Sequence, residues 1–291
     1  MLLRRPVDLK LLRPCLCVML IAMGSAGCAP LRRTNPVDAR PAAASTVRRF
    51  PAPEASQAVA VDDRYFYAIG SAVIGKYDKR TGAQVAVWTP EPGQHVAHLN
   101  SGIVLDRMLY CAHSNYPDTP MVSSIEVFDA ARLSHVRSIP LPGGIGSATW
   151  VERTAGVWWV TFAHYAGKGG IPGKGPDATR LVRFSDDWQV EASYAFPPAV
   201  VKRWGAMSSS GGALAGPRTF LTTGHDAPEL YVVEVPDRGD ALVLRAIVAV
   251  ESEGQGVAVD RTDGMVYGIR RQAREIVVSQ IPERYSLITN R

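Results

Sequence analysis

From about residue 46 the hydrophobic positions gather in short β-rich runs, and almost no stretch has the spacing of an amphipathic helix. Short runs rich in Val, Ile, Tyr and Phe alternate with turns that contain Gly, Pro and Asp. The pattern predicts an all-β domain over residues 46–291. Many short strands at regular intervals are typical of a repeat architecture.

The strand-like runs fall into five similar rows. Each row opens with a six-residue run, and these runs are QAVAVD from Gln57, SGIVLD from Ser101, SATWVE from Ser147, GGALAG from Gly211 and QGVAVD from Gln255. The row starts lie 44, 46, 64 and 44 residues apart, which is the length of a four-stranded propeller blade. The long third interval holds an insertion at residues 167–177 and an extended loop before Ser210.

The last row lacks a fourth strand of its own. Residues 46–50 (TVRRF) resemble the fourth strand of the second row, which begins at His135, so we expect them to close the last blade. An N-terminal strand in that position removes a sheet edge that would otherwise be open. The rows resemble the β-propeller superfamily over residues 46–282 and predict a five-bladed propeller. A six-bladed propeller is the alternative if residues 185–210 hide a degenerate blade.

The first 45 residues have a different character. Four basic residues precede a nine-residue apolar run at residues 15–23, which is half the length that spans a bilayer and is typical of a signal peptide. The following SAGC sequence resembles the lipobox of bacterial lipoproteins, although Ser25 stands where that family usually has Leu. The resemblance implies a signal peptide over residues 1–28, a lipid on Cys28, and a tether over residues 29–45 that is rich in Pro, Ala and Arg.

With Ala29 after the cysteine, the lipoprotein resemblance implies an outer-membrane location facing the periplasm. The alternative is ordinary secretion, with cleavage near Ala29. Once Cys15, Cys17 and Cys28 are set aside, Cys111 is the only thiol left, so no internal disulfide forms. We interpret Cys111 as a small buried hydrophobe.

Charge excludes one class of partner. The formal net charge is +5, but nine basic and two acidic residues lie within the first 50 positions. The remaining residues carry 23 basic and 25 acidic side chains, so the predicted propeller has no basic face for nucleic acid. We expect a monomer whose partner is a small molecule or a protein of the cell envelope.

Three of the five rows have a histidine at the same aligned position, and we call this set the histidine column. It is the most specific functional signal in the sequence. The second run of each row ends at Gly70, His113, His164, His225 or Arg270, and in a propeller these positions ring the axis at one face. We assign catalytic roles to His113, His164, His225 and Arg270. Three interpretations of the histidines remain open: a divalent-metal site, metal-free proton transfer, or hydrogen bonds to backbone that lock neighbouring blades together.

The starts of the rows are predicted to lie at the same face. The candidate ligand-binding residues are therefore Ser101, Ser147, Ser210 and Gln255, joined by His98, Asn100, Asn115, Asp226 and Arg271, with Gln57 at the first row start. Arginine clamps a carboxylate, and imidazole abstracts a proton next to a carbonyl group. The combination predicts a lyase or isomerase acting on a carboxylated or sugar-like molecule, with a sugar acid or lactone as first choice. The competing hypothesis is a non-catalytic scaffold of the cell envelope.

Two runs, HSNYP from His113 and GHDAPELY from Gly224, resemble segments of bacterial propeller proteins labelled cycloisomerase-like. That resemblance implies little about the reaction, because propellers host unrelated functions.

Two further features have less specific interpretations. Acidic residues end four of the first runs, at Asp62, Asp106, Glu152 and Asp260, and we interpret them as acceptors in tight turns. The inserted loop carries Lys168 and Lys174, so it either covers the mouth of the site or is a tolerated surface insertion.

Overall fold

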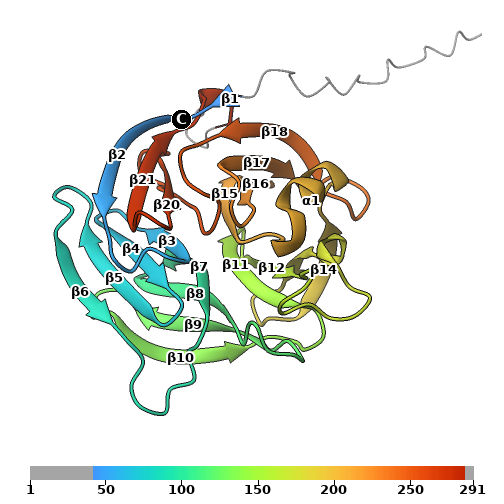
Figure 1. The fold of residues 1–291 in the computed structure, drawn as a ribbon, viewed down its shortest axis with the longest axis horizontal. Coiled ribbons are helices and arrows are strands. Elements are labelled where there is room, and N and C mark those ends of the chain that lie inside the picture. Colours follow the sequence, from blue (N-terminus) through green and yellow to red (C-terminus); the bar gives the residue numbers. More distant parts are fainter. Residues whose placement is uncertain (1–41, 286–291) are drawn as a thin grey trace, which may run out of the picture. The chain divides into compact units, whose positions relative to one another are not determined.

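The computed structural model describes residues 42–285. The predicted signal peptide, Cys28 and the first part of the predicted tether lie outside this range. Within it, five sheets surround a common centre (Figure 1), which confirms the five-bladed β-propeller. Each sheet contains four strands running outward from the axis, and the fourth sheet has an additional strand.

The first three blades each follow directly in the sequence. Blade one consists of β3 (Ala58–Val61), β4 (Tyr65–Gly70), β5 (Val73–Asp78) and β6 (Gln84–Trp88). Blade two consists of β7 (Leu99–Leu105), β8 (Met108–Ser114), β9 (Ser123–Asp129) and β10 (Ser134–Pro140). Blade three consists of β11 (Ser147–Thr154), β12 (Val157–Ala163), β13 (Arg180–Phe184) and β14 (Val190–Ala195).

The last two blades both take a strand from the beginning of the described chain. Blade four consists of β15 (Gly211–Gly216), β16 (Thr219–Thr223), β17 (Glu229–Glu234) and β18 (Val243–Ala249), with β1 (Ala42–Ala43) added in parallel to β18. Blade five consists of β19 (Ala258–Val259), β20 (Val266–Arg270), β21 (Glu275–Gln280) and the N-terminal β2 (Ser45–Pro51).

Strand β2 closes the ring as the sequence predicts. It runs antiparallel to β21, with Thr46 opposite Ser279 and Phe50 opposite Ile276. Strand pairing includes residues 42–45, which the sequence assigns to the tether. Ala42 and Ala43 lie opposite Val248 and Ala249, where the outer edge of β18 offers free backbone groups.

The connection between blades three and four holds helix rather than a sixth blade. It contains α1 (Pro198–Trp204) and the short 3₁₀ turn η2 (Gly205–Met207). Two further 3₁₀ turns are η1 (Pro176–Ala178) and η3 (Glu283–Tyr285). Among residues 42–285, no helix has the length and apolar character needed to cross a membrane.

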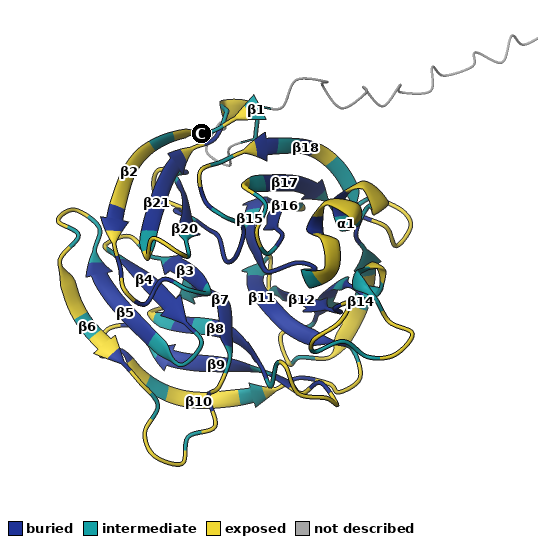
Figure 2. Ribbon diagram, in the orientation of Figure 1, coloured by how far each residue is buried: buried dark blue, intermediate teal, exposed yellow. Residues whose placement is uncertain are grey.

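The hydrophobic core lies between the blades. Five buried apolar clusters each join the facing sides of two consecutive blades, including the pair formed by blades five and one. Outer strands such as β6 and β10 are largely exposed, whereas the inner strands are buried (Figure 2). Cys111 is buried in the cluster between blades one and two, and burial raises the pKa of its thiol, as expected of a structural residue.

Candidate functional site

A pocket of about 220 Å³ opens at the end of the propeller where the inner strands begin. Every blade or its adjoining loop contributes to its lining, which consists of Gln57, His98, Asn100, Tyr116, Thr149, Tyr165, Lys168, Met207, Ser210, His225, Gln255 and Arg271. Two of these residues are cations and none is a carboxylate. The pocket is therefore suited to a small anionic molecule.

Five of the lining residues come from equivalent places near the start of the inner strand, one from each blade. We call this set the axial ring, and its members are Gln57, Asn100, Thr149, Ser210 and Gln255. Gln57 and Gln255 are row starts, and Ser210 directly precedes the row start Gly211. In blades two and three the ring residues are Asn100 and Thr149, whereas the row alignment expects Ser101 and Ser147.

Irregular strand pairing explains the displacement in blades two and three. The register between β7 and β8 shifts between Leu99 and Gly102, and that between β11 and β12 shifts between Ala148 and Trp150. Asn100 and Thr149 lie within these shifts. A bulge inserts an extra residue and re-aims the neighbouring side chains, so a row alignment without gaps misses it.

His98 lies in the pocket wall beside the ring. Its ring centroid is 5.1 Å from that of Tyr116, and its imidazole forms no hydrogen bond to any described residue. Burial lowers the pKa of His98 to about 4, with further contributions from the charges of His113 and Arg271. At neutral pH the imidazole is therefore uncharged and has a free nitrogen to accept a proton.

His225, Asp226 and Arg271 form a chain of hydrogen bonds, and His225 and Arg271 line the pocket. Nδ1 of His225 lies 2.7 Å from Oδ1 of Asp226, and Nε2 lies 3.1 Å from Nη1 of Arg271. Because a guanidinium group only donates, Nε2 accepts that bond and the proton is on Nδ1, which donates to Asp226. The imidazole thus orients Arg271, whose other N–H groups are left to bind a ligand.

The inserted loop provides the outer wall. Lys168 lines the pocket, whereas Lys174 does not. Ile171 packs against an apolar cluster that includes Tyr165 and Tyr116. Gly169 has φ +74°, and a Cβ atom there would lie 2.5 Å from the ring of Tyr116. The loop therefore packs on the aromatic wall and contributes Lys168 to the pocket lining.

His113 and His164 are held within the blades and do not line the pocket. Nε2 of His113 accepts a hydrogen bond from the backbone N–H of Ala97, and Nδ1 lies 2.9 Å from the Ser124 hydroxyl. Nε2 of His164 donates to the carbonyl of Ile145. Ser124 belongs to the same blade as His113, and Ala97 and Ile145 lie in the loops that lead into the blades of the two histidines. These contacts therefore hold each histidine in its own blade. Burial also lowers the pKa of both histidines.

The three histidines of the column therefore do not meet at one site, and only His225 lines the pocket. Within residues 42–285 no group of three His, Cys, Asp or Glu side chains is arranged to hold a metal ion. The metal interpretation required His113, His164 and His225 to converge. Their separation follows from the backbone bonds that hold the first two in the blades, so the metal assignment does not fit this geometry.

Several other predicted site residues have structural partners instead. Arg270 bonds Glu275, Asn115 bonds the backbone of Pro120 and Val122, and Ser101 bonds the carbonyl of Val257. Ser147 is buried outside the pocket lining, and Asp226 contributes through His225. In contrast, one pocket is lined by six of the candidate residues, namely His98, Asn100, Ser210, His225, Gln255 and Arg271.

Sequence reasoning missed four lining residues, namely Tyr116, Thr149, Tyr165 and Met207. Tyr116 and Tyr165 each follow a histidine of the column closely, at the point where the second strand ends. Their rings form a T-shaped pair with centroids 5.0 Å apart. Aromatic residues beside the column were a usable signal, because loops at this end of the blade carry the pocket walls.

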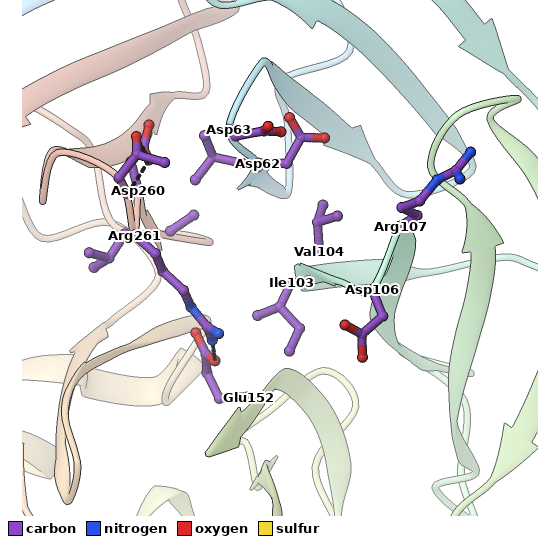
Figure 3. A pocket seen from close by; sticks show the side chains of 14 residues that line it. Asp62, Asp63, Ile103, Val104, Asp106, Arg107, Glu152, Asp260 and Arg261 are labelled. Carbon is purple, nitrogen blue, oxygen red and sulfur yellow. Dashed lines mark hydrogen bonds and ion pairs between the residues drawn. The ribbon is translucent and has the colours of Figure 1, made fainter. Parts of the chain in front are cut away.

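A second pocket of about 330 Å³ lies at the opposite end of the inner strands (Figure 3). Its lining includes the predicted turn acids Asp62, Asp106, Glu152 and Asp260. Asp62 accepts bonds from the backbone N–H groups of Arg64 and Tyr65, and Asp260 accepts from that of Thr262, as the turn interpretation predicts. These two carboxylates are therefore committed to the scaffold.

Glu152 departs from the turn pattern. Its carboxylate accepts a 3.0 Å bond from the backbone N–H of Leu214 in blade four, and another from Arg261 in blade five. Figure 3 shows Arg261 reaching across the pocket to Glu152. Burial raises the pKa of Glu152 while Arg261 opposes that change. Glu152 thus joins three blades, which gives this end of the propeller a structural role.

Comparison with known proteins supports the fold and leaves the function open. No family model matches the chain, and no curated protein matches it. Among solved structures, Myxococcus xanthus glutaminyl cyclase has a TM-score of 0.58 at 9% identity, covering 83% of this chain and 98% of the cyclase. Kuenenia stuttgartiensis hydrazine synthase has a TM-score of 0.46 at 11% identity, covering 88% and 99%. At such identities the likeness concerns the fold alone.

Proposed function

We propose that the pocket at the axial ring binds a small molecule bearing a carboxylate. The observation that carries this proposal is the charge of the lining, in which Lys168 and Arg271 face the cavity without any acidic side chain. Arg271 is fixed by His225, so its remaining N–H donors are held ready for a bidentate partner.

We further propose that the site catalyses an elimination or isomerisation, with His98 as the base. His98 takes a proton from the carbon next to the carboxylate. In an elimination, the electron pair of the broken C–H bond forms a double bond to the neighbouring carbon as a hydroxyl group leaves it and accepts the proton from His98, so water is the second product. In an isomerisation, the carboxylate holds the electron pair as an enediolate until the proton returns to the same carbon from the other face. The free imidazole nitrogen and the adjacent cation support this assignment.

The alternative of a protein-binding scaffold has weaker support. The large exposed hydrophobic side chains among the described residues are Val47, Val85, Val87, Val122, Val136 and Val190. Most lie on the outer strands of different blades, as single apolar side chains on a protein surface commonly do.

The location belongs to the same proposal. The resemblance of SAGC to a lipobox supports a lipid anchor on Cys28, with the propeller facing the periplasm. We expect radiolabelled palmitate to be incorporated into the wild-type chain and not into Cys28→Ser. Equal labelling of the two chains, or none in either, contradicts the anchor without affecting the pocket.

Calorimetry with the purified full-length chain tests carboxylate binding. A panel of small carboxylates is compared with their primary amides, and Arg271→Gln is compared with Arg238→Gln, whose side chain lies on an exposed loop of blade four. We expect carboxylates to bind and amides not to bind, and Arg271→Gln to weaken binding about 10- to 100-fold. Equal affinity in Arg271→Gln and Arg238→Gln would overturn the proposal. Product formation by any bound carboxylate is then followed by NMR.

A further inference from the structure

The axial ring has a chemical character of its own that the two cations do not explain. All five side chains are neutral and polar, and each comes from a different blade. Asn100 and Gln255 are only 5% and 2% exposed, although both line the pocket. A buried polar group needs a hydrogen-bond partner, which makes the ring a place where a ligand's polar groups are recognised.

The three carboxamide groups in the ring are oriented by the protein. Nε2 of Gln57 donates to the Ser71 hydroxyl at 3.1 Å, Nδ2 of Asn100 donates to the Ala148 carbonyl at 3.3 Å, and Nε2 of Gln255 donates to the His225 carbonyl at 3.0 Å. In each case one N–H of the NH₂ group is bonded to the scaffold. The carbonyl oxygen of each amide is left without a partner among the described residues.

Gln255 shows how firmly this orientation is imposed. Its backbone has φ +64°, a left-handed conformation that a non-glycine residue rarely adopts. The backbone N–H of Gln255 is bonded to the Gly224 carbonyl, and its side chain to that of His225. Backbone strain kept in place by surrounding bonds is typical of functional positions.

Three oriented acceptor oxygens require a ligand with several hydrogen-bond donors. Those donors are either hydroxyl groups or an ammonium group. An ammonium group would share the pocket with Lys168 and Arg271 without a carboxylate to offset its charge, so repulsion and desolvation both oppose it. Hydroxyl groups carry no such cost. They also accept bonds, which suits the Ser210 hydroxyl on the same ring.

The remaining walls fit a ring-shaped body. Tyr116 and Tyr165 present an aromatic surface on one side, and the cavity of about 220 Å³ is smaller than the roughly 300–1,000 Å³ pockets that take drug-sized ligands. A single sugar-sized ring is therefore favoured over an oligomer.

From this geometry we infer that the ligand is a single polyhydroxylated carboxylate of the sugar-acid class. This inference rests on the proposed function: Arg271 and Lys168 bind the carboxylate, and the amide oxygens of Gln57, Asn100 and Gln255 accept from its hydroxyl groups.

Three probes of similar size separate the inference from the proposal on which it rests. D-galacturonate has a carboxylate and hydroxyl groups, cyclohexanecarboxylate has the carboxylate alone, and L-glutamine has a carboxylate and an ammonium group. Calorimetry on the full-length chain should show galacturonate binding at least 10-fold more tightly than the other two. Each hydroxyl group that finds an acceptor contributes up to about 10-fold.

Two variants assign the preference to the ring. Gln57→Met replaces an amide by an apolar side chain of similar size at a partly exposed position. It should weaken galacturonate binding 3- to 10-fold and leave cyclohexanecarboxylate unchanged, whereas Arg271→Gln should weaken both. Asn100→Leu provides a second ring variant, and its unfolding midpoint shows whether the blade is intact.

The outcomes are distinguishable. Equal binding of galacturonate and cyclohexanecarboxylate, with both sensitive to Arg271→Gln, overturns the sugar-acid inference and leaves carboxylate binding in place. Tighter binding of glutamine also overturns the inference, because it requires an ammonium site. If no probe binds and Arg271→Gln has no effect on any of them, both the inference and the proposed function fail.

Discussion

His98 is the residue whose ionisation is most altered by the pocket. Burial lowers its folded-state pKa to about 4 from the ordinary 6.5. As the pH falls, the unfolded chain binds a proton at this side chain first. Above pH 6.5, neutral His98 therefore does not lower the free energy of unfolding. As the pH falls from 6.5 to 4, the protein loses roughly 3 kcal/mol of unfolding free energy because of this side chain.

Replacing this histidine should flatten that part of the stability profile. We expect His98→Gln to lose less unfolding free energy than the wild type between pH 7 and pH 4.5, by about 2 kcal/mol, measured by urea denaturation at each pH. His95→Gln, on the exposed loop just before, is the matched control and should follow the wild type. A His98→Gln profile parallel to that of the wild type would show that burial does not depress this pKa.

Glu152 is the residue on which the opposite end of the propeller depends. Glu152→Ala leaves the backbone N–H of Leu214 without its acceptor and Arg261 without its partner, and should lower the free energy of unfolding by about 2 kcal/mol. Asp63→Ala removes an exposed carboxylate from the same pocket and should change it by less than about 0.5 kcal/mol. Equal effects in thermal unfolding would contradict the blade-joining role.

At the scale of elements, the inserted loop at residues 167–177 packs against Tyr116 and carries Lys168 into the pocket lining. Gly169→Ala places a Cβ atom 2.5 Å from the Tyr116 ring, so the loop must move and carry Lys168 away. We expect a Kd for a bound carboxylate about tenfold higher, with little change in the unfolding midpoint. Gly173 has a similar positive φ of +79°, and a Cβ atom there would meet no atom within 4 Å. Gly173→Ala therefore controls for backbone strain alone. Equal Kd values for the two variants would mean that the loop does not position Lys168.

Strand β2 holds the ring closed through its buried face. Phe50 is 4% exposed and its ring centroid lies 4.9 Å from that of Phe66 in blade one. Phe50→Ala should cost about 3–4 kcal/mol of unfolding free energy in urea denaturation, in the range for large-to-small substitutions in a core. Val47→Ala on the exposed face of the same strand should cost less than about 0.5 kcal/mol. A small loss for Phe50→Ala would argue against closure by this strand.

At the scale of the whole molecule, the repeat made the architecture predictable. Row spacing gave the blade count, and the resemblance of residues 46–50 to a fourth strand gave the closure. The site was less predictable because it depends on single residues. The bulges in β7 and β11, which bring Asn100 and Thr149 into the ring, leave no mark on a row alignment without gaps. The histidine column marked the right end of the blades, yet backbone acceptors and donors hold two of its members away from the pocket.

The two ends of the propeller thus differ in how their polar groups are used. At the acidic end, Asp62, Glu152 and Asp260 are bonded to turns or to neighbouring blades. At the ring end, the side chains of His98 and Lys168 and the amide oxygens of the ring have no hydrogen-bond partner among residues 42–285. Ligand binding is therefore expected at the ring end.

A crystal structure of the protein soaked with D-galacturonate tests this central claim most directly. We predict the sugar acid in the ring pocket, with its carboxylate within hydrogen-bond distance of the Arg271 guanidinium group. Galacturonate bound instead beside Asp62 and Arg261 at the opposite end, or an empty ring pocket at saturating concentration, would contradict it.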